Sequence, residues 1–124
     1  MSECHFCKVD EKRVVERSPF SVVIRDAYPV TDQHTLVIPN RHVASFFELT
    51  TEEVADVMKL LSTQQRSIRE LDKTVTGFNI GINVGEDAGQ TIFHCHIHLI
   101  PRRRGDVESP RGGVRGVIPG KASY

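Results

Sequence analysis

The chain has 124 residues, of which 39% are hydrophobic and 26% are charged, and its formal net charge at pH 7 is zero. This length and composition are typical of one globular domain with a buried core, and they exclude a disordered or fibrous protein. The apolar runs are far shorter than the roughly 20 residues of a membrane helix, and a neutral chain attracts nucleic acid only weakly, so we expect neither partner.

The N-terminal segment, MSECHFCKVDEKR, contains a CxxC pair formed by Cys4 and Cys7, and it shows no apolar core of a signal peptide. We therefore expect a cytoplasmic protein, and three cysteines in a reducing compartment argue against a disulfide framework. The CxxC spacing suits a metal ion or redox chemistry. The order of strand, CxxC and helix that surrounds a thioredoxin motif is absent here.

The first half of the chain predicts two strands followed by one long helix. Short β-branched runs at 21–25 and 35–38 are separated by a turn-rich connection, as is typical of strands. Thr50 and Glu53 have the spacing of a capping box, so we expect a helix from about Thr51 to Asp72. Its apolar residues recur at helical spacing and predict one buried face, formed by Val54, Val57, Met58, Leu61, Ile68 and Leu71.

In the second half the hydrophobic period changes to two, which predicts strands. From Gly77 to Val84 apolar residues alternate with asparagine and glycine, and from Thr91 to Ile100 three histidines alternate mainly with apolar residues. The loop between them, Gly85 to Thr91, has the length of a hairpin connection. Its glycines would let backbone N–H groups converge on an anion, although a plain turn fits equally well.

The three histidines, His94, His96 and His98, lie within the heptapeptide HCHIHLI. Alternate residues of a strand share a face and are about 7 Å apart, so three imidazoles can meet at one ligand. They could bind one catalytic metal ion, or divide the roles of nucleophile, phosphate ligand and metal ligand, or be structural histidines. Three histidines in phase make the purely structural interpretation the weakest.

Residues 102–124 differ in composition from the rest of the chain. They carry six Lys or Arg and two Asp or Glu, which is a net charge of +4, and they are rich in glycine. Such a tail is either solvated and partly flexible, or it reaches over an anionic substrate or a partner subunit. Nucleic-acid binding through Arg102, Arg103 and Arg104 is a weaker hypothesis, because no aromatic residues are interleaved with them.

The histidine segment resembles the HφHφHφφ signature of the histidine triad (HIT) family, in which φ is apolar. The resemblance extends from about residue 4 to residue 101. It includes Asp26, His34 with the run Leu-Val-Ile-Pro that follows, His42, Asn83 and the segment Gly89-Gln90-Thr91. The CxxC pair and the tail resemble a zinc-containing bacterial branch of HIT hydrolases.

This resemblance implies an α+β fold of the HIT type, with an antiparallel sheet of about five strands, one main helix and a two-fold homodimer. Residues 1–101 would form the HIT domain with an N-terminal CxxC zinc knot, and residues 102–124 would form a basic tail. Zinc-bearing members imply a Zn2+ site made of Cys4, Cys7, His42 and His94. Four protein ligands leave no position for water, so the ion would be structural. His5 is an alternative ligand that we expect to point outward.

The resemblance also implies catalytic roles for His96, His98 and His34. His96 would attack the α-phosphorus of a nucleotide conjugate and form a nucleotidyl-histidine intermediate, which water then hydrolyses. His98 would hydrogen-bond the phosphate or the bridging oxygen, and His34 would support it. This chemistry suits imidazole, which is a good nucleophile when neutral and a good leaving group once phosphorylated. The implied substrate-binding residues are Asp26 for the ribose, and Asn83, Gly89, Gln90 and Thr91 for the phosphate.

We therefore expect a hydrolase that releases a nucleoside monophosphate from a leaving group. A dinucleoside polyphosphate such as diadenosine tetraphosphate is favoured because a basic tail suits a long polyanion, and a nucleoside phosphoramidate is the alternative. Two further hypotheses remain open. One is a catalytic metal held by all three triad histidines, which would lose turnover with a chelator. The other is a non-catalytic nucleotide-binding module, which needs no intact nucleophile.

Overall fold

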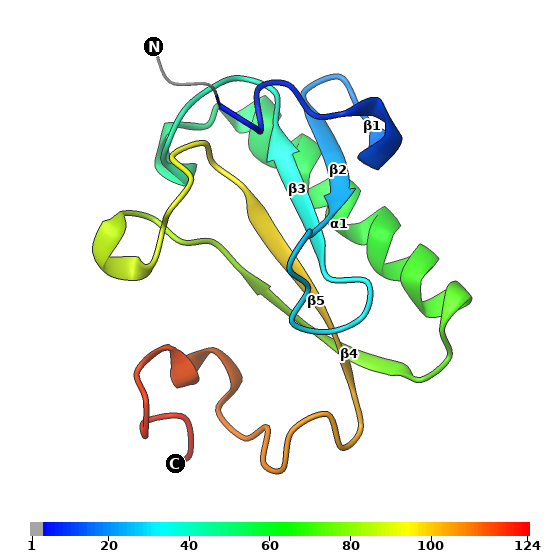
Figure 1. Ribbon diagram of the computed structural model, residues 1–124, viewed down its shortest axis with the longest axis vertical. Coiled ribbons are helices and arrows are strands. Elements are labelled where there is room, and N and C mark those ends of the chain that lie inside the picture. Colours follow the sequence, from blue (N-terminus) through cyan, green and yellow to red (C-terminus); the bar gives the residue numbers. More distant parts are fainter. Residues whose placement is uncertain (1–3) are drawn as a thin grey trace.

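Five strands form one antiparallel sheet in the computed structural model, which describes residues 4–124 (Figure 1). In chain order they are β1 (Val14–Arg17), β2 (Ser21–Arg25), β3 (Thr35–Pro39), β4 (Val75–Gly81) and β5 (Ile97–Arg103). Their order across the sheet is β1-β2-β3-β5-β4, so β5 lies between β3 and β4. The expected α+β fold is confirmed, and residues 1–3 of the expected domain lie outside the described residues.

Helix α1 (Thr51–Leu71) covers one face of the sheet (Figure 1). It begins at the predicted capping box, in which the side chains of Thr50 and Glu53 each accept the other residue's backbone N–H. The core between helix and sheet is built from Val23, Val37, Ile97 and Leu99 of the strands and Val57, Leu60, Leu61 and Ile68 of the helix. Within residues 4–124 no helix is long and apolar enough to cross a membrane.

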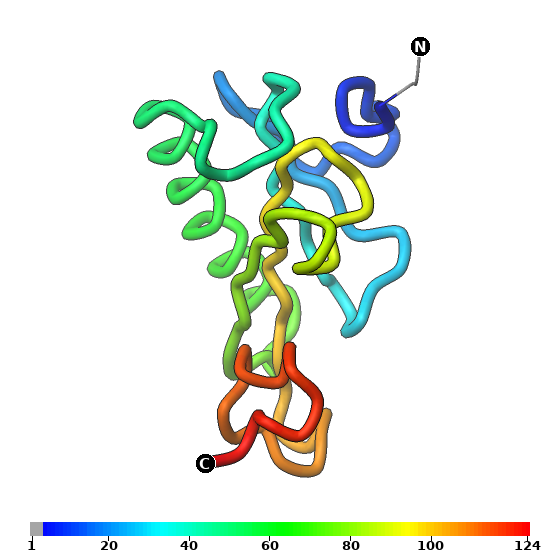
Figure 2. Tube along the Cα trace, turned by 90° about the vertical axis from the view of Figure 1, so that its left-hand side faces the viewer, coloured from blue at the N-terminus to red at the C-terminus, as the bar shows by residue number. Residues whose placement is uncertain are grey.

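Two segments that are far apart in the sequence lie over the opposite face of the sheet. The N-terminal segment covers β2 and β3, where Phe6 packs with Val22, Ile24, Leu36 and Ile38. The chain beyond β5 folds back beside β4, and its short 3-10 helix η4 (Gly113–Val117) contacts that strand (Figure 2). His98 lies on this face, since it pairs with Leu36 of β3.

The strand expected at residues 91–100 begins only at Ile97, and the strand expected at 77–84 ends at Gly81. His94 and His96 therefore precede β5, and the connection between β4 and β5 is longer than a hairpin loop. The N–H of Cys95 donates to the carbonyl of Val43 at 2.7 Å instead of to a neighbouring strand. Alternating burial continues through this extended segment, which explains why its sequence has the period of a strand.

The tail beyond β5 is folded. Gly112 has a φ of +91°, and a Cβ at this position would overlap the carbonyl oxygen of Ala122, so only glycine allows the two segments to meet. The C-terminal Tyr124 ring lies 5.0 Å from the guanidinium carbon of Arg111 and 4.7 Å from that of Arg115. These cation–π contacts occupy two of the arginines that the sequence suggested for an anionic ligand.

Candidate active site

Four potential metal ligands meet beside the start of the triad: Cys4, Cys7, His42 and His94. Their ligand atoms all lie within 4.8 Å of one another. His94 Nδ1 is 3.1 Å from His42 Nδ1 and 3.3 Å from Cys4 Sγ, and Cys7 Sγ is 3.2 Å from His42 Nδ1. Such spacings suit a tetrahedral Zn2+ ion, whose bonds are about 2.0–2.3 Å long. His5 is exposed and does not belong to this group.

His94 is prepared for metal binding by its other ring nitrogen. Nε2 lies 2.7 Å from the carbonyl oxygen of Pro39, to which it donates. This hydrogen bond places the ring proton on Nε2 and leaves the Nδ1 lone pair directed at the cluster. The ring is fully buried, and this burial lowers its pKa, so the ring is neutral, as a metal ligand must be. The donor set therefore fits a structural zinc ion.

His96 is held by the backbone of the same segment. Its Nδ1 lies 2.8 Å from the carbonyl oxygen of His94, so the ring donates there and keeps Nε2 unprotonated when neutral. The ring of Phe6 packs against it edge-on, with the ring centroids 5.0 Å apart. His96 remains partly exposed. A neutral imidazole with a free and accessible Nε2 can act as a nucleophile.

His34 and His98 form a hydrogen-bonded pair in which each tautomer is determined by its neighbour. The backbone N–H of Val30 donates to His34 Nδ1 at 3.2 Å, so the His34 proton is on Nε2 and is donated to His98 Nδ1 at 2.9 Å. This network assigns the His98 proton to Nε2, where it can be donated to a substrate oxygen. Burial lowers the pKa of both rings, that of His98 to about 4, so both are neutral at pH 7.

The geometry favours divided roles for the triad over one shared metal site. Within residues 4–124, ligand atoms that could hold an ion form two groups, and His94 belongs to the group with the cysteines. His98 belongs to the other group, with Asp26 and His34, and His96 belongs to neither. In that second group, the N–H donated to His34 Nδ1 keeps a proton on the Nε2 that would have to bind the ion. A metal ion at this second group is therefore disfavoured.

The loop before the triad is shaped by Gln90. Its buried amide donates through Nε2 to two backbone carbonyls and accepts a backbone N–H through Oε1. Gly89 has a φ of +94°, and this left-handed conformation ends the short 3-10 helix η3 (Glu86–Ala88). Thr91 is exposed. Because the Gln90 amide is occupied by the backbone, it positions the loop, and the contacts of Gly89, Gln90 and Thr91 with phosphate stay predictions.

A cavity of about 490 Å³ lies beside the histidine pair, and it is lined by His34, His98 and the predicted Asn83. Asp26 is not among its lining residues. Its Oδ1 accepts the N–H of Tyr28 at 2.8 Å, and its Oδ2 lies 3.5 Å from His34 Nε2, so its contact with ribose stays a prediction. Sequence reasoning did not predict the other residues that line this cavity, which include Val30 and Asn79 and, in the tail, Val114 and Val117. The polar face of the strand that contains Asn79 could have indicated that Asn79 lines the site. No feature of the sequence indicated that the tail lies against this cavity.

The similarity to known proteins agrees with this architecture. Residues 8–105 match the family model described as the HIT domain. The chain belongs to the HIT family. It is 42% identical over 89 residues to the nitrilase and fragile histidine triad fusion protein NitFhit of Caenorhabditis elegans, an alignment that covers 72% of this chain and 20% of that protein.

Two further HIT proteins are relevant to the site. The bis(5'-nucleosyl)-tetraphosphatase [asymmetrical] of Schizosaccharomyces pombe is 36% identical over 94 residues, which are 76% of this chain and 51% of that protein. The chain thus spans a fifth of the nematode relative and about half of the yeast one. A Zn-bound histidine triad family protein from Mycobacterium smegmatis superposes with a TM-score of 0.76 and 35% identity, covering 86% of this chain and 79% of that one.

Proposed function

We propose that this HIT protein is a nucleotide hydrolase that cleaves at the α-phosphate of a nucleotide conjugate through a covalent intermediate on His96. One observation carries the proposal: His96 offers an unprotonated Nε2, and His98 offers an N–H from a ring whose centroid is only 5.3 Å away. A phosphate bound between them meets a nucleophile and a hydrogen-bond donor. The name of the yeast tetraphosphatase supports the same class of reaction.

In the first step, Nε2 of His96 attacks the α-phosphorus. The N–P bond forms while the bond from phosphorus to the bridging atom breaks, and the electron pair leaves with the leaving group. His98 hydrogen-bonds the bridging atom through its Nε2–H and keeps that proton, and His34 holds His98 in the tautomer that can do so. The His96 ring becomes positively charged, and the hydrogen bond from Nδ1 to the carbonyl of His94 stabilises this charge.

In the second step, water attacks the same phosphorus and the N–P bond breaks. The electron pair returns to Nε2 of His96, and the nucleoside monophosphate is released. The water gives one proton to solvent, which replaces any proton that the leaving group took, and His98 stays neutral and keeps its Nε2–H. Both steps use the chain's own histidines, since a phosphorylated imidazole is a good leaving group.

The cluster of Cys4, Cys7, His42 and His94 would hold a Zn2+ ion in a structural role. An ion with four protein ligands supplies no open position for a reactant, and it would fasten the N-terminal segment to the segment before β5. His94 belongs to the cluster through its ring and supports His96 through its carbonyl. The ion would therefore help to orient His96 without joining the reaction.

A dinucleoside polyphosphate is the substrate class that we favour, as in the name of the yeast relative. The tail arginines are weaker support than the sequence suggested, because Arg111 and Arg115 stack on Tyr124. A nucleoside phosphoramidate is the second candidate, and one observation favours it. The residues that line the cavity beside His98 include neither lysine nor arginine, which suits an uncharged leaving group.

A homodimer is also part of the proposal. β4 is an edge strand of the sheet, so one side of its backbone has no strand partner within residues 4–124. Its Ile80 side chain is 51% exposed. An unpaired edge with an apolar side chain is a surface on which a second copy of the chain can pair.

The test is intact-mass spectrometry after brief mixing with diadenosine tetraphosphate and, separately, with adenosine 5′-phosphoramidate. We expect a transient adduct of the mass of AMP in the wild type and none in His96→Ala. His5→Ala is the matched control, because His5 is an exposed histidine outside both ligand groups. Saturable nucleotide binding without any adduct or turnover would contradict the proposal and favour the non-catalytic binding module.

A further inference from the structure

The face of β5 that carries His98 continues beyond the triad. Ile100 and Arg102 follow on the same face, because alternate residues of a strand point the same way. Their partners on β4 are Gly81 opposite His98, Asn79 opposite Ile100 and Gly77 opposite Arg102. The two glycines have no side chains to cover β5. Asn79 is therefore the β4 side chain that stands between the two glycines on this face, and it lines the cavity beside His98 together with Ile80. We call this cavity and its continuation along β5 the groove.

Asn79 is held in one orientation by an ion pair. Nη1 of Arg102 donates to Asn79 Oδ1 at 2.6 Å, while Nε and Nη2 of the same guanidinium bind the carboxylate of Asp106 at 2.8 and 2.9 Å. With Oδ1 occupied, the amide presents its Nδ2 donor, for which no hydrogen-bond acceptor exists among the described residues. Arg102 and Asp106 neutralise each other, so they act as positioning residues for Asn79.

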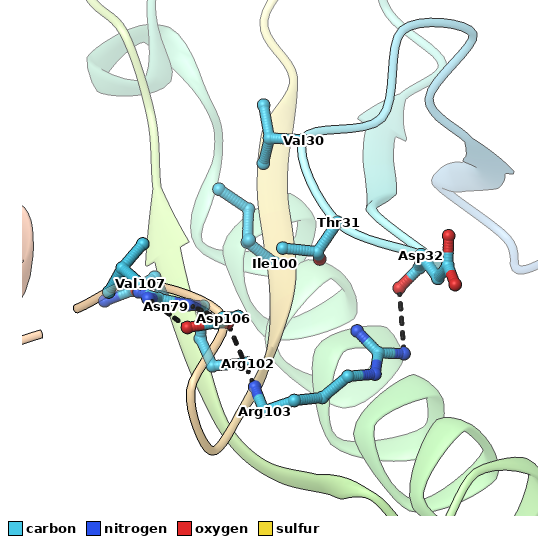
Figure 3. A pocket seen from close by; sticks show the side chains of 9 residues that line it. All are labelled: Val30, Thr31, Asp32, Asn79, Ile100, Arg102, Arg103, Asp106 and Val107. Atoms are coloured by element: carbon cyan, nitrogen blue, oxygen red, sulfur yellow. Dashed lines mark hydrogen bonds and ion pairs between the residues drawn. The ribbon is translucent and has the colours of Figure 1, made fainter.

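A second cavity, of about 500 Å³, is lined by residues that include Asn79, Ile100 and Arg103 (Figure 3). It shares Val30, Asn79 and Ile100 with the first cavity, so the two are contiguous. Arg103 lines its far side. The guanidinium of Arg103 binds Asp72, Gln33 and the backbone of Asp32 through Nε and Nη2. Its Nη1 has no hydrogen-bond partner among residues 4–124.

We propose that this groove binds the distal phosphates of a polyphosphate leaving group, with Asn79 donating through Nδ2 and Arg103 through Nη1. The inference rests on the proposed function, because it assumes that the α-phosphate lies between His96 and His98. From His98 to Arg102 the strand spans about 13 Å, a distance that a chain of several phosphates can cover and a single phosphate cannot. The groove would thus distinguish long leaving groups from short ones.

The test compares two substrates that transfer the same AMP group. Diadenosine tetraphosphate has distal phosphates and adenosine 5′-phosphoramidate has none, so the ratio of their kcat/KM values reports on the groove. Asn79→Asp keeps an oxygen for Arg102 but replaces the amide donor with a negative oxygen. We expect this variant to lower the ratio at least tenfold, mainly through KM, because a charge-assisted hydrogen bond is lost and repulsion is added.

A second variant, Arg103→Lys, keeps a cation for Asp72 and removes the free guanidinium nitrogen, and we expect a loss of about threefold in the ratio. Asn40→Asp and Arg104→Lys are the matched controls, because both residues are exposed and line neither cavity. We expect both controls to keep the wild-type ratio. Thermal unfolding of each variant, recorded in parallel, shows whether it is folded.

Two results would overturn the subsite alone: a wild-type ratio in both Asn79→Asp and Arg103→Lys, or equal losses on the two substrates. Equal losses would mean that these residues act on the α-phosphate or on the fold. A different result would overturn the proposed function itself, and the subsite with it, namely a wild-type protein that hydrolyses neither substrate.

Discussion

From the ion pair between Arg41 and Glu53 we predict how much one side chain contributes to the free energy of unfolding. The Glu53 side chain is only 5% exposed and accepts two hydrogen bonds from the Arg41 guanidinium, at 2.8 and 3.1 Å, and one from the backbone N–H of Thr50. Chiefly through the hydrogen bonds from Arg41, the pKa of Glu53 is lowered from 4.5 to about 2. Glu53→Gln removes the charge but keeps an oxygen for the capping box.

The expected size of the effect follows from this pKa. A shift of this size corresponds to about 3 kcal/mol of stabilisation of the folded state. The Arg41 side chain is half exposed, so solvent screening reduces our expectation to about 2 kcal/mol. A pKa that is lowered in the folded state stabilises the protein above the unfolded value of 4.5. This contribution is lost as the pH falls from 4.5 towards 2.

The measurement is urea unfolding of the wild type and of Glu53→Gln at pH 7 and at pH 3. We expect a difference of about 2 kcal/mol in the free energy of unfolding at pH 7, and less than half of it at pH 3. Glu52→Gln is the matched control, because Glu52 is exposed and makes no ion pair within residues 4–124. A difference below about 0.5 kcal/mol at pH 7, or one that is the same at both pH values, would refute the reasoning.

Three further predictions follow from the site and the tail. Gly112→Ala should open the tail and make it sensitive to trypsin. Gly116→Ala should not, because a Cβ at this position makes only an ordinary van der Waals contact. Equal digestion of both variants would count against the packing described. NMR of the ring nitrogens should show His98 neutral and protonated at Nε2 from pH 7 to pH 5, and a titration near 6.5 would contradict the assigned network. The Cys7→Ser variant should purify with much less zinc and have a lower Tm. The Cys95→Ser variant should retain the zinc, because Cys95 lies outside the cluster. Equal zinc content in the two variants would argue against the cluster.

The elements that were predicted correctly depend on local signals. The capping box of Thr50 and Glu53 and the helical spacing after it are contained in one segment, so the start and length of α1 could be derived without the rest of the chain. The predicted buried face was only partly right, because Met58 and Leu71 are exposed and Leu60 is buried in their place. The alternation of His94, His96 and His98 is likewise visible within one short segment. The meeting of the metal ligands was implied by family resemblance, because no local pattern places Cys4 beside a histidine 90 residues later.

The parts that were missed depend on contacts between distant segments. The start of β5 was misplaced because the backbone N–H of Cys95 donates to Val43, which lies outside the sheet, and alternating burial alone does not show this. The position of Asn79 opposite Ile100 requires the register between β4 and β5, which the sequence of neither strand determines. The path of the tail depends on the contact of Gly112 with Ala122, which composition alone does not indicate.

Strand β3 has a consequence for the orientation of the catalytic groups. At its end, the carbonyl of Pro39 binds the His94 ring, whose own carbonyl holds His96. Just before its start, His34 holds His98. The nucleophile and the hydrogen-bond donor are thus each tied to one end of the same five-residue strand. The two groups are two residues apart in the chain, so β3 does not set their spacing but fixes the orientation of both rings. A change in the length of β3 would therefore alter their alignment on the phosphate even with every histidine in place.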